Sequence, residues 1–452
     1  MLVTSAQAPV YDVLGIGFGP SNLALAIAIE ESARSLHARP FRAHFFEKQA
    51  CFGWHRGMLL DEATMQISFL KDLATMRNPT SEFSFLRYLH DKDRLVDFIN
   101  HKSLFPSRVE FHDYLEWAAA RVAHCVSYHC KVIEVQPVQR DGVVEYLDVV
   151  VQRGGDQAGR EVYRARNIVV AVGLEAMMPA GVVPSDRIWH SADTLDRIER
   201  LREEPKLVAV VGAGQSAAEI TAFMHDRFAQ AEVRSVFTRY GYSTSDDTPF
   251  ANQIFDPEAV DDFFSAPADV KRMLFDYHKN TNYSVADPDV INELYRRMYQ
   301  ERVRGEQRLR IMRATRVLGA RTTPTSVELT VEHLPTGARS QFHADLAIFS
   351  TGYRPGDPLC LLGALADACL RDDEGRLGIA RDYRIRTAEH VHCGIYVQGA
   401  TEYSHGISSS LLSNTAVRAG EILESIVRRD GPPASLLINS EHRRGNGVPS
   451  QP

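Results

Sequence analysis

Residues 11–22 read Y-D-V-L-G-I-G-F-G-P-S-N, and this stretch decides the fold of the first part of the chain. A short β-rich run, residues 11–16, leads into closely spaced glycines, and an apolar, helix-favouring segment, residues 23–30, follows. The order strand, tight glycine turn and helix is the context in which such glycines bind a dinucleotide. The backbone approaches the pyrophosphate there, and its charge lies at the helix N-terminus. The sequence therefore predicts a Rossmann-type nucleotide fold.

The first glycine loop departs from the pattern G-x-G-x-x-G, because Pro20 replaces the third glycine. Proline fits a first helical turn, where its missing N–H is not needed. A second strand, residues 43–46, ends in Glu47, and an acid there normally bonds the ribose hydroxyls of the adenosine half. Glu47 lies 32 residues after Gly15, against a usual spacing of roughly 20, so we expect a long first crossover. The residues expected to bind this dinucleotide are Gly15, Gly17, Gly19, Pro20, Ser21, Asn22, Glu47 and Lys48.

A second strand–glycine–helix unit lies near the middle of the chain. Residues 207–211, L-V-A-V-V, form an apolar run typical of a buried parallel strand, and they lead into G-A-G-Q-S-A-A-E. The next strand, residues 233–238, is followed by Arg239 instead of an acid. A basic residue there suits the extra phosphate of NADP, although a solvated surface arginine is the alternative. The residues expected to bind this second dinucleotide are Gly212, Gly214, Gln215, Ser216 and Arg239.

Two dinucleotide folds in one chain indicate two bound dinucleotides, the flavin FAD and its reductant NADPH. Residues 344–353, A-D-L-A-I-F-S-T-G-Y, resemble the A-T-G motif that links the domains of two-dinucleotide flavoproteins, and residues 167–173 resemble the strand that closes the FAD domain. We expect the cofactors to lie near Thr351, Gly352 and Tyr353.

The expected NADPH-binding domain is inserted into the FAD-binding domain. The predicted parts are the FAD-binding domain in residues 1–195, the NADPH-binding domain in residues 196–335 with a substrate segment at about 240–300, the return of the FAD-binding domain in residues 336–430, and a flexible tail in residues 431–452.

Composition and charge argue against several classes of protein. The formal net charge is −7, which gives no general attraction to nucleic acid or to an anionic membrane. No apolar run approaches the roughly 20 residues needed to cross a bilayer, and no export signal stands at the N-terminus, so we expect a cytoplasmic protein. The six cysteines include no C-x-x-C pair, which argues against a dithiol redox centre or a zinc ribbon. No cluster of metal ligands is evident.

Five further motifs narrow the class of flavoprotein. In chain order they are F-G-W-H-R-G-M (52–58), M-Q-I-S-F-L-K-D-L-A-T-M-R-N-P-T-S (65–81), S-D-D-T-P-F-A-N-Q-I-F-D-P-E (245–258), T-N-Y-S (281–284) and H-G-I-S-S-S-L-L-S (405–413). With these motifs the sequence resembles the microbial N-hydroxylating flavin monooxygenases, and within them the ornithine hydroxylases of hydroxamate siderophore pathways. The resemblance implies an α/β fold of the class B flavin monooxygenase type, with two Rossmann-like domains and a small substrate-binding segment.

The residues themselves suit an amino-acid substrate. Lys71 stands in an otherwise apolar stretch, which places an ammonium near the core, and Asn252 and Asn282 each lie close to an aromatic residue. A zwitterion needs a cation for its carboxylate and neutral polar groups for its other hydrogen bonds. A snorkelling surface lysine and turn asparagines are the alternatives.

The resemblance assigns further roles, none of them to a catalytic side chain. It implies that Lys71, Asn252 and Asn282 hold the α-carboxylate and α-amine, and that Gln66 lies near the flavin and the reacting amine. It also implies that the segment with Ser410 and Leu411 approaches flavin and substrate, although the contacting serine among Ser408, Ser409, Ser410 and Ser413 stays open. Trp54, His55 and Met58 are expected along the flavin.

The implied reaction is the hydroxylation of the side-chain amine of L-ornithine by O2 through a flavin hydroperoxide. Its product would serve the synthesis of a siderophore or another hydroxamate-type metabolite, and members of the family are often homotetramers. The same chemistry on L-lysine or on a diamine such as putrescine or cadaverine is the nearest alternative; a carboxylate site at Lys71 argues against the diamines. Ornithine over lysine rests on the resemblance alone, because one methylene is worth only about 1–3 kcal/mol. Another two-dinucleotide oxygenase or reductase is the remote alternative.

Overall fold

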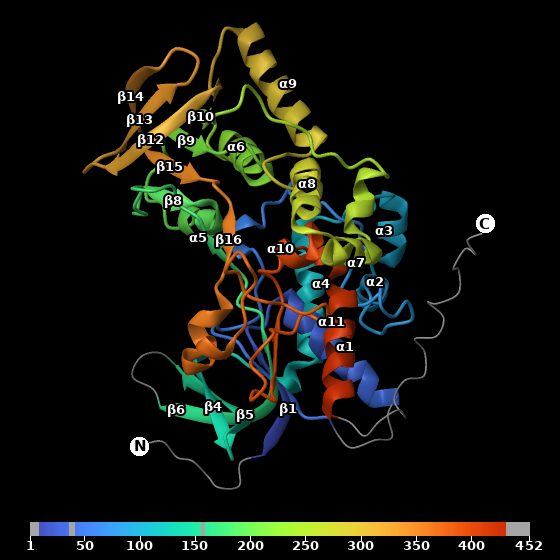
Figure 1. The fold of residues 1–452 in the computed structure, drawn as a ribbon. Helices are drawn as coiled ribbons and strands as arrows, with labels where there is room; N and C mark the ends of the chain where they lie inside the picture. Colours follow the sequence, from blue (N-terminus) through green and yellow to red (C-terminus); the bar gives the residue numbers. More distant parts are fainter. Residues whose placement is uncertain (1–8, 36–40, 155–158, 431–452) are drawn as a thin grey trace, which may run out of the picture.

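The computed structural model describes residues 9–35, 41–154 and 159–430, so the predicted tail, residues 431–452, lies outside the described residues. Two β-sheets with parallel centres lie one above the other in Figure 1, each covered by helices. Both predicted glycine units form as strand, loop and helix, one in each sheet.

The first sheet is built around the predicted N-terminal strand. β1 runs parallel to both of its neighbours, β2 and β6, and β17 runs parallel to the second half of β6. The strand order is β3 (Val126–Ser127), β2 (Ala43–Phe46), β1 (Val10–Ile16), β6 (Arg160–Val170), β5 (Val143–Arg153) and β4 (Cys130–Arg140), with β17 (Gly394–Val397) beside β6. β1 and β2 thus confirm the two strands expected around the first glycine loop.

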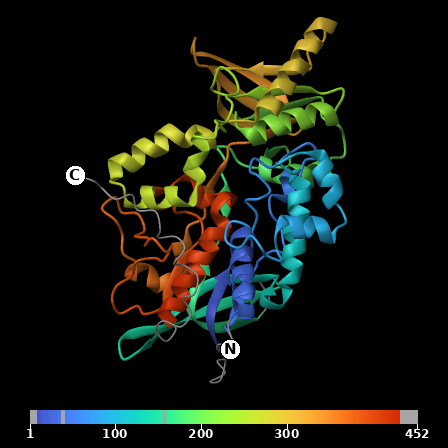
Figure 2. The ribbon, with the colours of Figure 1, turned by 90° about the vertical axis from the view of Figure 1, so that its right-hand side faces the viewer.

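Helices from both ends of the chain cover one face of this sheet. α1 (Pro20–Ser35) and α11 (Thr415–Asp430) lie side by side, as the blue and red helices in Figure 2 show. The core beneath them joins α1 to the helices α2 (Phe85–Asp91), α3 (Leu95–His101) and α4 (Arg108–Arg121). No helix in the described part of the chain is long and apolar enough to cross a membrane.

The second sheet carries the second glycine unit and is parallel throughout. Its order is β11 (Leu309–Met312), β10 (Glu232–Val236), β9 (Leu207–Val211), β15 (Leu346–Phe349) and β8 (Ile188–His190). α6 (Gln215–Arg227) follows β9, and the antiparallel strands β12 (Thr315–Thr322), β13 (Val327–His333) and β14 (Ala338–Ala344) extend this lobe. β8 and β15 belong to this sheet but lie outside residues 196–335, the predicted NADPH-binding domain. The limits of that domain therefore remain a prediction.

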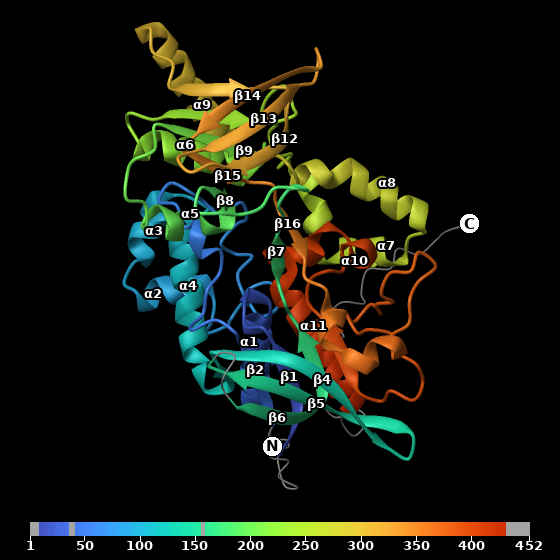
Figure 3. The same ribbon diagram turned by 90° about the vertical axis from the view of Figure 1, so that its left-hand side faces the viewer.

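A short antiparallel pair connects the two lobes, formed by β7 (Leu174–Ala176) and β16 (Tyr353–Pro355). Beside it, α7 (Pro257–Ser265) and α8 (Ala268–His278) leave the upper lobe and reach the short helix α10 (Glu402–His405) of the lower one, as Figure 3 shows. The predicted substrate segment therefore touches both lobes.

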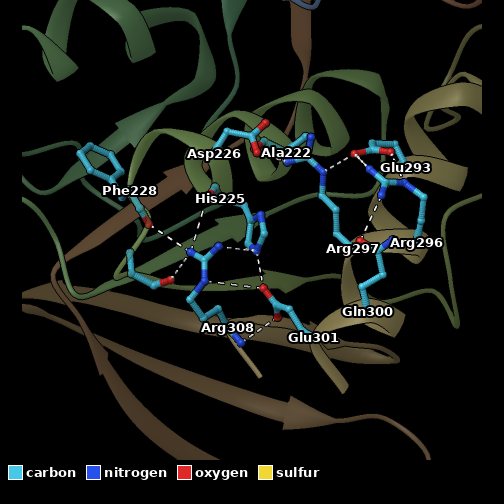
Figure 4. A network of polar contacts seen from close by, with 11 residues as sticks. Ala222, His225, Asp226, Phe228, Glu293, Arg296, Arg297, Gln300, Glu301 and Arg308 are labelled. Carbon is cyan, nitrogen blue, oxygen red and sulfur yellow. Dashed lines mark hydrogen bonds and ion pairs between the residues drawn. The ribbon is translucent and has the colours of Figure 1, made fainter. Parts of the chain in front are cut away.

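An ionic network fixes helix α9 (Pro288–Arg304) to the second sheet (Figure 4). Glu301 lies 2.6 Å from the His225 ring nitrogen, and its other oxygen accepts the backbone N–H groups of Arg308 and Leu309, each at 2.8 Å. The Arg308 guanidinium lies 3.6 Å from Glu301. A buried carboxylate that is hydrogen-bonded in this way anchors its helix firmly.

Candidate functional site

The first glycine loop is shaped for the close approach of a phosphate group. Gly17 has φ +83°, and a Cβ there would lie 2.4 Å from the Ala171 carbonyl oxygen; a Cβ at Gly15 would lie 2.1 Å from the Phe45 ring. Beside Gly19, in contrast, no atom lies within 4 Å of the Cβ position. The first turn of α1 contains no acidic residue, so its N-terminus presents an open, positively polarised surface. This loop fits a dinucleotide.

Two predicted cofactor residues hold the loop in place. The Asn22 side chain, which is fully buried, donates to the Gly17 carbonyl at 2.7 Å and accepts from Gln398 at 2.9 Å. The Glu47 carboxylate accepts the backbone N–H of Phe18 at 2.7 Å and that of Gln49 at 2.8 Å. Their contacts to a bound cofactor stay a prediction. Pro20 and Ser21 open α1, while Lys48 is exposed.

A buried arginine that the sequence analysis missed lies behind this loop. The Arg418 guanidinium donates to the Ser409 carbonyl at 2.6 Å and lies 3.4 Å from both Ser21 Oγ and Gln398 Oε1. Arg418 is 2% exposed and forms no ion pair with a described residue. Burial lowers its pKa, since an uncompensated charge is costly inside a protein. An arginine on the otherwise apolar face of an amphipathic helix, beside Ala419 and Ile422, was the available sequence signal.

The late serine-rich segment contains polar atoms without protein partners. The hydroxyls of Ser409 and Ser410 and both ends of the Asn414 amide are buried and form no hydrogen bond within the described residues. Unsatisfied buried polar groups require an explanation, and a bound cofactor or substrate is a sufficient one. Ser409 and Ser410 are therefore the stronger of the four candidate serines. Leu411 follows them and is half-buried.

The second glycine loop repeats the first in the upper lobe. Gly212 has φ +141°, and a Cβ there would lie 2.4 Å from the Ser350 carbonyl oxygen. Gly214 is the N-cap of α6, and Gln215 and Ser216 form its first turn. The loop thus fits a second dinucleotide through its backbone.

Two predicted residues of this unit contact the segments around residue 285. Gln215 accepts the backbone N–H of Asp287 at 2.7 Å. Arg239, exposed beyond the end of β10, donates to the Ser284 carbonyl at 2.7 Å. A contact between Arg239 and a phosphate stays a prediction.

The crossover motif meets the predicted flavin-side residues. Gly352 accepts a hydrogen bond at 3.0 Å from His190, and Thr351 donates to the Met177 carbonyl. The Tyr353 ring packs edge-on against His55, with ring centroids 5.7 Å apart, and Trp54 contacts His55 in turn at 4.9 Å. The structure thus brings residues about 300 positions apart together between the sheets.

A buried ion pair ties the two lobes directly. The Arg108 guanidinium bonds both oxygens of Glu219 in α6, at 2.8 and 2.9 Å, and also donates to the Met58 carbonyl at 3.0 Å. The exposed fractions of the side chains are 12% and 5%. The sequence analysis quoted Glu219 with the second glycine motif but did not identify a partner for it. Only the fold brings Arg108 to it.

The candidate substrate site begins at Lys71. The Lys71 ammonium lies 5.8 Å from the centroid of the Phe255 ring. Burial lowers its pKa, and the nearby Asp256 opposes this shift. Phe255 belongs to η4 (Ala251–Phe255), which also carries the half-buried Asn252. Asn252 donates to the Asp247 carbonyl at 2.7 Å. Lys71 and Asn252 thus lie on neighbouring segments.

The loop that carries Lys71 is fixed by its neighbour. The buried Asp72 carboxylate accepts hydrogen bonds from the backbone N–H groups of Ala74, Thr75 and Phe85 at 2.9, 2.6 and 2.7 Å. This carboxylate, which the sequence analysis did not single out, orients the loop. Gln66, earlier in the loop, is exposed.

The other half of the site comes from the T-N-Y-S and H-G-I-S segments. Asn282 is exposed, and the hydroxyl of the next residue, Tyr283, donates to the Glu402 carboxylate of α10. η8 (Ile407–Ser410) packs against both α10 and η4. Three predicted substrate segments therefore meet around η8.

His405 fixes the turn between α10 and η8. Its ring is fully buried, stacks on Tyr383 with centroids 4.2 Å apart, and lies 3.1 Å from the Arg381 carbonyl. Burial is the main cause that lowers the pKa of His405 to about 4, so this ring is neutral near pH 7.

The whole chain is similar to enzymes that hydroxylate amino-acid side chains. The family model described as L-lysine 6-monooxygenase/L-ornithine 5-monooxygenase matches residues 9–355. The L-ornithine N(5)-monooxygenase of Burkholderia cepacia is 40% identical over 409 residues, covering 88% of this chain and 90% of its own. That of Pseudomonas aeruginosa is 37% identical, with 98% and 99% covered.

Solved structures of enzymes with related activities also match this chain over most of its length. The ornithine N-hydroxylase of Kutzneria sp. 744, described with reduced FAD, NADP⁺ and L-ornithine, matches with a TM-score of 0.90 and 47% identity, covering 94% of this chain and 100% of its own. The L-lysine 6-monooxygenase of Pseudomonas syringae matches at 0.82 and 30%, covering 93% and 100%. A cadaverine monooxygenase of Erwinia amylovora matches at 0.81 and 25%, covering 98% and 99%.

Proposed function

The chain belongs to the L-lysine 6-monooxygenase/L-ornithine 5-monooxygenase family, and from this premise we propose that it hydroxylates the side-chain amine of L-ornithine with FAD, NADPH and O2. The observation that carries the proposal is the match over 94% of the chain to an ornithine hydroxylase described with reduced FAD, NADP⁺ and L-ornithine. The lysine and cadaverine enzymes are more distant in sequence, which favours ornithine over both alternatives.

FAD, reduced by NADPH, supplies activated oxygen, which no protein side chain can provide. The first glycine loop, with Gly17 and Gly19, would hold the FAD pyrophosphate, and the buried, unpartnered Ser409 and Asn414 side chains would bond the flavin. The second loop, at Gly212 and Gly214, would hold NADPH, and the exposed Arg239 would bind its extra phosphate.

The protein must bind the amino acid, orient its amine and exclude water. Lys71 pairs with the substrate carboxylate, since its ammonium lies in a half-buried position and forms no ion pair with a described residue. Asn252 and Asn282 take the remaining polar groups of the α-carbon, and Gln66 and Ser410 lie toward the amine. Burial favours the neutral amine that the reaction needs, because it disfavours the cation.

The setting of the enzyme belongs to the same proposal. We infer a cytoplasmic homo-oligomer that makes N-hydroxyornithine for a siderophore or a similar hydroxamate. The assembly and the product's use rest on the family, and the compartment rests on the sequence pattern.

The decisive experiment measures hydroxylamine product from the FAD-loaded protein with NADPH and air, over L-ornithine, L-lysine and putrescine. Product mainly from ornithine is expected, and NADPH should reduce the flavin faster than NADH. NADPH consumption alone is insufficient, because uncoupled turnover also consumes it and yields hydrogen peroxide. Product mainly from lysine or putrescine would overturn the substrate, and no product from any amine would overturn the activity.

A further inference from the structure

Glu402 is a half-buried carboxylate with an unusual lack of positive partners. Its hydrogen bond comes from the neutral phenol of Tyr283, and it forms no ion pair with any residue that the structure describes. Burial is the main cause that raises its pKa, and the nearby Tyr283 and Ser410 hydroxyls oppose that shift. A desolvated anion without a cation is costly, so a positively charged ligand would offset the cost.

Glu402 also lies where the candidate substrate segments meet. Tyr283, which holds it, follows the predicted substrate residue Asn282. Ser410, whose buried hydroxyl lies near Glu402, belongs to η8, which packs against α10. Glu402 therefore lies beside two of the candidate substrate segments.

The charges of the site match those of an amino acid. Lys71 is a cation without an ion-pair partner in the described chain, and Glu402 is an anion in the same condition. Asp256 is the charged group that raises the pKa of Lys71, whereas the Tyr283 and Ser410 hydroxyls lower the pKa of Glu402. η4, which carries the Phe255 ring beside Lys71, and α10, which carries Glu402, both pack against η8, so the two side chains flank one segment without pairing with each other.

We propose that Glu402, oriented by Tyr283, binds an ammonium group of the amino-acid substrate while Lys71 binds its carboxylate. This inference rests on the proposed function and names a residue that the resemblance did not assign. An amino-acid substrate with an amine on its side chain has two ammonium groups, at the α-carbon and at the end of the side chain. Because the reaction needs a neutral side-chain amine, the α-ammonium is the group that a carboxylate can hold throughout the reaction, and the experiment distinguishes the two.

The test measures equilibrium dissociation constants by calorimetry with the FAD-loaded protein in the presence of NADP⁺. The ligands are L-ornithine, L-norvaline, which lacks the side-chain amine, and 5-aminopentanoate, which lacks the α-amine. Glu402→Gln keeps the shape of the side chain and removes its charge, and Glu402→Asp keeps the charge. Tyr283→Phe removes the supporting hydroxyl, and Glu389→Gln, at an exposed glutamate outside the site, is the matched control.

Glu402→Gln is expected to weaken ornithine binding on the order of a hundredfold, as the loss of a buried charge partner does. Glu402→Asp and Tyr283→Phe should weaken it less, and Glu389→Gln should leave it unchanged. A parallel loss for norvaline alone assigns Glu402 to the α-ammonium, and a parallel loss for 5-aminopentanoate alone assigns it to the side-chain ammonium.

Ornithine binding by Glu402→Gln within twofold of the wild type would overturn the inference. Equal losses for all three ligands, or similar losses with Glu402→Asp, would overturn it too, because they would indicate a change of shape instead of charge. If the wild-type protein itself neither binds nor hydroxylates ornithine, the proposed function fails first, before any variant is compared.

Discussion

The second and third glycines of the first loop constrain the chain in different ways. Gly17 needs both its positive φ and the space beside the Ala171 carbonyl, whereas Gly19 has a negative or extended backbone and open space at its Cβ position. The folded protein requires the positive φ and the close packing at Gly17 even without a ligand. The open space at Gly19 matters only when a ligand lies against the loop.

Gly17→Ala should therefore destabilise the cofactor-free protein, by about 1–3 kcal/mol from backbone strain before any clash is counted. Gly19→Ala should leave that stability within about 0.5 kcal/mol but weaken FAD binding at least tenfold. Urea unfolding of the cofactor-free protein and flavin titration measure the two quantities. Unchanged FAD binding in Gly19→Ala would show that the open space at Gly19 is not a binding surface.

Lys71 is the residue on which the carboxylate site depends. Lys71→Ala should raise the ornithine KM by about a hundredfold, since a buried charged hydrogen bond to a ligand is worth roughly 2–5 kcal/mol. Reduction of the flavin by NADPH should remain almost intact, because Lys71 is not among the residues of either glycine loop. Stopped-flow reduction and steady-state kinetics separate these effects. The exposed Lys102 provides a control, and an unchanged ornithine KM in Lys71→Ala would contradict the carboxylate role.

At the scale of elements, local sequence was sufficient where one strand and one turn carry the information. The apolar run of β9 and the glycines that follow it predict β9 and α6 because parallel strands and helix N-termini leave periodic, short-range patterns. The first unit, with β1, β2 and α1, was predicted for the same reason.

What the sequence did not predict depends on pairs that only the fold brings together. Glu219 and Arg108 are 111 residues apart, and Tyr283 and Glu402 are 119 apart. Neither partner is unusual by itself on a helix or in a loop. Arg418 is different, because its position on the buried face of α11 interrupts an apolar pattern that is visible in the sequence. The sequence does not show that Arg418 lacks an ion-pair partner among the described residues.

The ion pair between α4 and α6 permits a test of how the lobes are held together. Arg108→Met should cost about 3–5 kcal/mol, because it leaves the buried Glu219 carboxylate without its cation and with only the Gln215 amide as a side-chain donor. The double variant Arg108→Met/Glu219→Met should cost less than the sum of the two single variants. Urea unfolding measures the stabilities, and the rate of flavin reduction by NADPH reports on the alignment of the lobes. Arg87→Met, at an exposed ion pair with Glu82, should cost under about 1 kcal/mol; additive effects of Arg108 and Glu219 would exclude direct coupling.

For the whole molecule, buried histidines determine how stability changes with acid. Burial lowers the pKa values of His44, His112 and His405, the last to about 4. The unfolded chain binds a proton at each of these rings near pH 6.5, whereas the folded protein resists protonation. Folded stability is therefore greatest above pH 6.5 and falls as the pH decreases toward 4. The buried Asp72, whose pKa is raised by burial, works in the opposite direction: below its raised pKa the folded protein binds the proton more readily than the unfolded chain.

His405 alone should account for about 2 kcal/mol of the loss between pH 7.5 and pH 5, because each pH unit below 6.5 costs about 1.4 kcal/mol until the folded pKa is reached. His405→Gln cannot be protonated, so its free energy of unfolding should be lower than that of the wild type at pH 7.5 but should fall less on acidification. Urea unfolding at the two pH values measures the difference. His101→Gln, at an exposed ring, should follow the wild type. If His405→Gln loses as much stability as the wild type between the two pH values, the buried ring carries its proton in the folded protein, and the turn before η8 is not held by a neutral histidine.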